Sequence, residues 1–174
     1  MKGQLTLEFF ITMIFFVIFV FYIYQKFATN IPIFIDEIKK EDIRSKAFQI
    51  SEVLINDPGH PADWTLGNVE RVGLSDENYN KTNLISIDKI ADLDDICSGM
   101  GGHDYGDLQD YLAIYEPFSI YIFDIDQSTG ARAELGSCEP PQGTYRIMNA
   151  TVRRITAYSD AFGITGLAEV IVQV

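Results

Sequence analysis

The chain has 174 residues and a formal net charge of −12. This length leaves room for one domain beside a membrane segment. The acidic balance argues against nucleic acid and anionic lipid surfaces as partners, because both select for basic patches.

Residues 5–24 form an apolar stretch whose only charged residue is Glu8. As an α-helix, a stretch of this length reaches about 30 Å, which is the thickness of the hydrocarbon core of a bilayer. A carboxylate in lipid costs roughly 2.5 kcal/mol or more, so we expect Glu8 to have a partner. The apolar core is longer than that of a secretory signal peptide and has no Ala-x-Ala-like site behind it.

The start of this stretch carries a specific pattern, which reads Lys2-Gly3-Gln4-Leu5-Thr6-Leu7-Glu8-Phe9. It resembles the class III signal peptides of archaeal type IV pilin-like proteins. The resemblance implies a leader of residues 1–3, cut between Gly3 and Gln4 by a prepilin peptidase, with Lys2 on the cytoplasmic side. It also implies that Glu8 and Phe9 act in assembly, where the glutamate meets the new N-terminal amine of a neighbouring subunit. Archaellins generally lack the Gln-to-Glu pattern, so a pilin is favoured; a plain single-pass anchor is the alternative.

The helix is predicted to continue past the membrane stretch and to cover residues 4–56. Apolar residues recur there at a spacing close to 3.6, namely at Ile31, Phe34, Ile35, Ile38, Ala47, Ile50, Val53 and Leu54. Pro32 lacks an N–H and crowds the preceding turn, so we expect a kink or a locally melted turn there. The Asp57-Pro58-Gly59 sequence predicts the end of the helix.

Residues 57–174 are predicted to form an extracellular globular domain, which makes the chain α+β. Short helices are expected after an N-cap at Ser86, through residue 96, and over residues 107–115. Segments rich in β-branched and aromatic residues predict strands at residues 118–125, 131–135, 145–158 and 166–174. We expect an antiparallel meander of about four strands, with one face against the amphipathic half of the long helix.

Two covalent features would suit an exported domain. Cys97 and Cys138 lie 41 residues apart without a CxxC motif, which predicts one disulfide, with two buried free thiols as the alternative. The sequons at Asn80 and Asn149 predict N-linked glycosylation, although such triplets also arise by chance.

The sequence shows no catalytic constellation, so we expect no enzyme activity, cofactor or metal. The segment from Asp124 faintly resembles a calcium loop, but its sixth and twelfth positions hold Thr129 and Leu135. His60 and His103 lie in separate loops without a third ligand. A solvated acidic face is the simplest interpretation of the remaining clustered acids, which are Asp92, Asp94, Asp95, Asp104, Asp107 and Asp110.

The resemblance implies a structural subunit of an extracellular type IV pilus-like filament that serves adhesion. The precursor would cross the membrane once with its N-terminus in the cytoplasm, in agreement with Lys2. The expected partners are other copies of the chain, other pilins, the prepilin peptidase and the membrane before assembly. The alternative is a minor or initiating pilin, or an anchored binding module, that does not form the bulk of a fibre.

Overall fold

The computed structural model describes residues 2–79, 81, 83–141, 143, 150–160 and 163–174. The chain divides into two compact units, Met1–Glu41 and Asp42–Val174. The fold is α+β, as predicted: residues 42–56 of a long N-terminal helix pack on a sheet, with short helices in between. In chain order the elements are α1 (Lys2–Asn56), η1 (Glu77–Tyr79), β1 (Leu84–Ser86), α2 (Ile87–Cys97), η2 (Met100–Gly102), α3 (Tyr105–Leu112), β2 (Ser119–Ile125), β3 (Arg132–Cys138), β4 (Thr151–Asp160) and β5 (Gly163–Gln173).

In the first unit the described residues, 2–41, all belong to α1. The helix continues through Pro32, so the prediction of a melted turn at this proline is wrong. A proline removes one backbone hydrogen bond, whereas the helix on both sides of it supplies many. A single lost bond is therefore not enough to interrupt a helix of this length.

The end of α1 is confirmed at Asn56, directly before the predicted stop sequence. The Asp57 carboxylate accepts a hydrogen bond from Gly59 N at 2.8 Å, and Gly59 adopts a left-handed backbone with φ +86°. A Cβ atom on Gly59 would clash with the ring of Trp64. The chain therefore turns sharply here because a glycine both reaches this conformation and leaves room for the tryptophan.

The second unit contains a five-stranded sheet with the order β1-β4-β5-β2-β3. Two antiparallel hairpins, β2–β3 and β4–β5, are joined by antiparallel pairing of β5 with β2. The sheet is therefore not the predicted meander. The additional strand β1 has only three residues and pairs in parallel with β4, with Leu84 opposite Ala157. A strand this short carries too few residues to show an alternating pattern.

The observed strand boundaries differ from the predicted ones by a few residues. The strand that begins at residue 131 in the prediction extends to Cys138, and the last strand begins at Gly163. The first part of the predicted strand 145–158, residues 145–149, lies outside the described residues, and β4 is described from Thr151.

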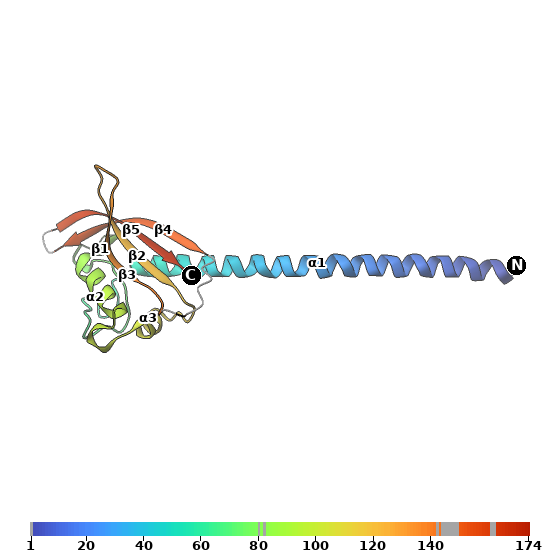
Figure 1. Ribbon diagram of the computed structural model, residues 1–174, viewed down its shortest axis with the longest axis horizontal. Helices are drawn as coiled ribbons and strands as arrows, with labels where there is room; N and C mark the ends of the chain where they lie inside the picture. Colours follow the sequence, from blue (N-terminus) through green and yellow to red (C-terminus); the bar gives the residue numbers. More distant parts are fainter. Residues whose placement is uncertain (1, 80, 82, 142, 144–149, 161–162) are drawn as a thin grey trace. The chain divides into compact units, whose positions relative to one another are not determined.

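One face of the sheet, together with the Asp42–Asn56 part of α1 and the short helices, forms the hydrophobic core. Figure 1 shows α2 and α3 on the same side of the sheet. The core residues that are at most 2% exposed include Ala47, Ile50, Leu54, Ile55, Ile90, Leu93, Ile96, Phe118, Ile120, Ile122, Val170 and Val172. Burying one such aliphatic side chain contributes about 1.5–3 kcal/mol, so this cluster dominates the stability of the second unit.

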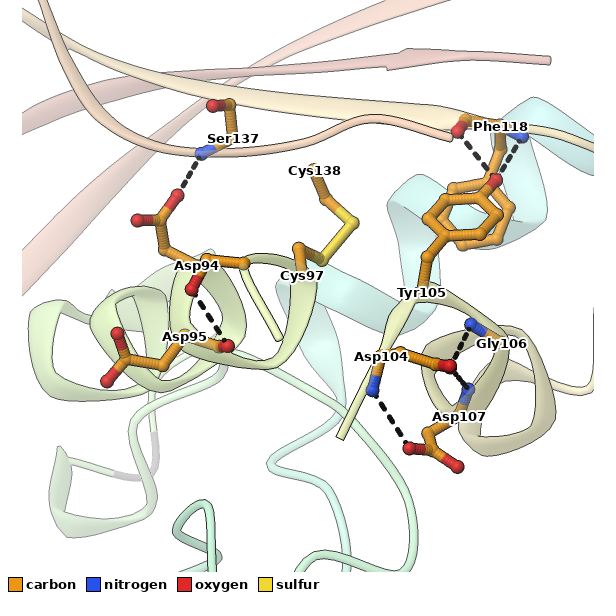
Figure 2. Close-up of a disulfide and its surroundings, with 11 residues drawn as sticks. Asp94, Asp95, Cys97, Asp104, Tyr105, Gly106, Asp107, Phe118, Ser137 and Cys138 are labelled. Atoms are coloured by element: carbon orange, nitrogen blue, oxygen red, sulfur yellow. Dashed lines mark hydrogen bonds between the residues drawn. A yellow bond between two sulfur atoms is a disulfide. The ribbon is translucent and has the colours of Figure 1, made fainter. Parts of the chain in front are cut away.

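The short helices have identifiable cap residues. Ser86 occupies the N-cap position of α2, as predicted, but its side chain makes no capping hydrogen bond. In α3 the Asp104 carboxylate accepts from the backbone N–H groups of Gly106 and Asp107, and the Asp107 carboxylate accepts from Asp104 N (Figure 2). This capping box starts the helix two residues before its predicted start. The left-handed residue Ala113, with φ 54°, ends it.

Candidate functional site

The residues predicted for processing and assembly lie near the start of α1. Lys2, Gly3 and Gln4 are helical, and Glu8 follows about one turn later. The side chains of Glu8 and Phe9 are exposed, Phe9 by 66%. Within the part of the chain that the structure describes, Glu8 forms no ion pair. Among the described side chains, the carboxylate of Glu8 therefore lies in an apolar surface without a cation beside it.

From Leu7 to Tyr24 the surface of α1 consists mainly of hydrophobic side chains. Every large hydrophobic side chain from Leu7 to Tyr24 is between 37% and 69% exposed. Exposed hydrophobic residues continue beyond this stretch, at Phe27, Ile31, Ile33, Phe34, Ile35 and Ile38. In length and composition α1 is a helix that could cross a membrane, as an anchor or as a signal segment.

The C-terminal part of α1 is held in the second unit by charged side chains that sequence reasoning did not single out. Arg154 on β4 donates a hydrogen bond to the Glu52 carboxylate at 2.6 Å, and its guanidinium lies 5.2 Å from the centre of the Phe48 ring. Lys46 pairs with Glu116, and this hydrogen bond lowers the pKa of the Glu116 carboxyl. No local signal could have revealed these pairs, because their members lie 70 or more residues apart.

The predicted disulfide between Cys97 and Cys138 is present, with an S–S distance of 2.01 Å. It joins the end of α2 to the end of the edge strand β3 (Figure 2). Close by, Ser137 N on β3 donates a hydrogen bond to Asp94 Oδ1 on α2 at 2.9 Å. The helix thus occupies a backbone donor of an edge strand, and such donors otherwise favour pairing with other chains.

A buried lysine, which the sequence did not reveal, joins the loop after α1 to the segment around Ser75. Lys89 on α2 is 7% exposed, and its Nζ donates to the carbonyls of Pro58 at 2.8 Å, Ala62 at 2.6 Å and Ser75 at 2.9 Å. Burial lowers the pKa of the Lys89 ammonium, while the charges of nearby acids, Glu77 above all, act in the opposite direction. The ammonium takes the position among carbonyl oxygens that a bound cation often occupies.

The residues considered for metal binding do not converge. His60 Nε2 lies 3.5 Å from the Glu70 carboxylate and His103 Nδ1 lies 3.6 Å from that of Asp107, in separate places. Among the described residues no group of three His, Cys, Asp or Glu side chains could hold a metal ion.

The segment that faintly resembled a calcium loop is the β2–β3 turn. Asp126 accepts hydrogen bonds from Ser128 Oγ at 2.6 Å and from Ser128 N at 2.7 Å. These bonds, with further ones from Thr129, lower the pKa of the Asp126 carboxyl to about 2. The carboxylate is therefore used to cap its own turn.

The predicted glycosylation sites, Asn80 and Asn149, lie outside the described residues. Comparison of the chain with known protein families, with curated proteins and with solved structures found no match. A function for the chain therefore has to be inferred from the surfaces described above.

Proposed function

We propose that the chain is a structural subunit of an extracellular type IV pilus-like filament, cut after Gly3 by a prepilin peptidase and assembled through α1. The observation that carries this proposal is that exposed hydrophobic side chains recur along α1 over a greater length than a bilayer covers. The sequence pattern around Gly3 and Glu8 supports it, because it resembles the pilin class of signal.

The length of the exposed surface favours a polymer over a plain anchor. From Leu7 to Ile38 the helix rises about 48 Å, whereas the hydrocarbon core of a bilayer covers about 30 Å. The hydrophobic side chains near Phe34, which is 64% exposed, would then project into water. Soluble surfaces rarely leave such patches uncovered. Side-by-side packing with α1 of other copies would cover them and would yield about 25 cal/mol for each Å² of apolar area removed from water.

Glu8 gains a role in the same arrangement. Cleavage after Gly3 would create a new amine at Gln4, which carries a positive charge in its protonated form. An ion pair between this amine and Glu8 of another copy would neutralise both charges within the apolar bundle, where an unpaired carboxylate is costly. The disulfide agrees with a domain outside the cytoplasm, because disulfides persist in oxidising compartments. Adhesion would be the task of the assembled filament.

The mass of the chain recovered from the cell surface tests the proposed processing. We expect a chain that begins at Gln4. A chain that keeps Met1 would contradict cleavage by the peptidase. The amount of the chain in sheared surface filaments then separates a major subunit, which dominates that fraction, from a minor or initiating one.

The Glu8→Ala variant tests the proposed assembly. We expect normal cleavage but a strongly reduced yield of filaments, because the amine of the neighbouring copy loses its partner. Glu37→Ala removes an acid from the same helix outside the membrane stretch and serves as the matched control. An unchanged filament yield in Glu8→Ala would refute the assembly role of Glu8.

A further inference from the structure

A hollow in the second unit lies between the C-terminal part of α1 and the end of α3. Its apolar lining comes from Ile50 and Val53 on α1, from Leu112 on α3 and from Ile114 directly after it. The volume of the hollow is about 230 Å³. Because an apolar cavity of about 150 Å³ binds benzene, this hollow has room for a phenyl ring. We call it the α1–α3 groove.

The charged side chains at the rim of the groove are already paired within the chain. Lys46 forms ion pairs with Glu116 and, at 3.2 Å, with Asp42. Gln49 is the remaining polar residue of the lining. The rim therefore gives no preference for a charged partner, whereas the lining favours an apolar side chain.

The segment that forms one wall of the groove has two features typical of a contact surface. Ala113, which lines the groove, has a left-handed backbone with φ 54°, a conformation that is unfavourable for alanine. Backbone strain of this kind collects at sites of contact and function. Two residues later Tyr115 is 80% exposed, more than any other large hydrophobic side chain that the structure describes. Tyrosine is enriched among the residues that dominate protein interfaces.

The chain itself exposes side chains of the matching kind. On α1, Phe27 and Phe34 are 62% and 64% exposed, and both lie past residues 5–24, which are long enough to span a bilayer. Phe27 lies only three residues past this stretch, where lipid can still cover it. Phe34 lies ten residues past it, about 15 Å along the helix. Both belong to the same continuous helix as Ile50, so neither can fold back into the groove of its own chain.

We infer that the α1–α3 groove of one copy receives the Phe34 ring from α1 of a second copy. The other exposed aromatic residue of α1 beyond Phe34 is Phe48, and its ring already lies beside the Arg154 guanidinium. A contact between two different surfaces does not close on itself and adds copies one after another. The inference rests on the proposed function in that α1 helices of different copies lie side by side. It adds the register: neighbouring copies are shifted along their helices, with Phe34 of one beside residues 46–53 of the other.

Cysteine cross-linking on intact cells tests this register in the full-length protein. The variants are Phe34→Cys, Gln49→Cys on the groove, and the double variant. The native cysteines are bonded to each other, so only the introduced thiols react. After mild oxidation we expect a ladder of multimers from the double variant, whereas each single variant stays monomeric. Dimers from Phe34→Cys alone would show helices that lie level with each other and would overturn the inference, as would the absence of a ladder from the double variant.

Exchange of the ring between the two surfaces supplies a test without cysteines. Phe34→Ala should lower the yield of sheared filaments about tenfold or more, because one buried phenyl ring is lost at every contact. Ile33→Ala, which truncates the adjacent exposed residue on another side of the helix, is the matched control and should change the yield less than about twofold. Val53→Phe should lower the yield by itself, because its ring occupies the groove, but should restore the yield of Phe34→Ala.

A normal yield in Phe34→Ala, or no rescue by Val53→Phe, would contradict the fit of Phe34 into the groove. Failure of the proposed function is seen separately, as absence of the wild-type chain from sheared filaments. Wild-type filaments that show neither the ladder nor the ring exchange would refute this contact alone.

Discussion

Replacing Lys89 by methionine should destabilise the second unit by about 2–4 kcal/mol. The substitution keeps an unbranched side chain of similar length but removes the ammonium that binds three carbonyl groups. The largest loss is expected at the carbonyl of Ser75, because its hydrogen bond to Lys89 is buried. Without its donor, this carbonyl would cost about 1–3 kcal/mol. The carbonyls of Pro58 and Ala62 are partly exposed, so water can replace much of what they lose.

Two opposing contributions set this range. A hydrogen bond to a charged group contributes about 1.5–3 kcal/mol, so the three bonds together exceed the loss at Ser75 alone. Burying the ammonium costs several kcal/mol, however, and the methionine variant no longer bears that cost. The net loss should therefore stay well below the sum of the three bonds.

Urea unfolding of the full-length chain in detergent measures this loss. The single tryptophan, Trp64, reports on the second unit, because it is 1% exposed and its Nε1 donates to Gly73 O at 2.7 Å. With a denaturant slope of about 1–3 kcal/mol/M, the midpoint of Lys89→Met should fall by about 1–2 M. Lys40→Met, on an exposed part of α1, is the control and should change stability by less than about 0.5 kcal/mol. Equal midpoints for Lys89→Met and the control would refute the structural role of this lysine.

Two further predictions concern the disulfide and the β2–β3 turn. Replacing Cys97 and Cys138 by serine should lower the free energy of unfolding by about 4 kcal/mol, because the bond closes a loop of 41 residues. In the same urea assay we expect the unfolding midpoint of this variant to equal that of the reduced wild type. A midpoint equal to that of the oxidised wild type would contradict the prediction. The Asp126 carboxyl should titrate near pH 2 by NMR, and Ser128→Ala, which removes the largest cause of the shift, should move its midpoint toward 3.8. Because the pKa of Asp126 is lower in the folded state, the contribution of Asp126 to stability is present above about pH 4 and is lost as the pH falls toward 2. An unchanged titration midpoint in Ser128→Ala would show that another group stabilises the carboxylate.

The sequence predicted the features that depend on neighbours in the chain. The end of α1 follows from the adjacent Asp57-Pro58-Gly59, and Ser86 occupies the predicted N-cap position of α2. The long apolar helix and the disulfide were also predicted. A long run of apolar residues and an isolated pair of cysteines are each compatible with few structures.

Features that depend on distant segments were not predicted. Lys89 resembles any other charged residue of an amphipathic helix, and only the fold brings the carbonyls of Pro58, Ala62 and Ser75 around it. Glu169 follows the alternating pattern of a solvated strand face, yet it is nearly buried, because Arg132 and Arg153 come from two other strands. The pairing of β1 with β4 likewise joins residues about 70 positions apart.

The position of β5 has a consequence for the way the protein is made. This strand is the last of the five along the chain but lies in the middle of the sheet, between β4 and β2. Before β5 has been synthesised, no strand is present to pair with both the hairpin β2–β3 and the strand β4. Each of them therefore exposes an unpaired edge. The helix α1 has emerged long before that stage. Insertion of α1 into a membrane can therefore precede folding of the second unit, and a membrane-tethered intermediate would keep such edges apart from those of other chains.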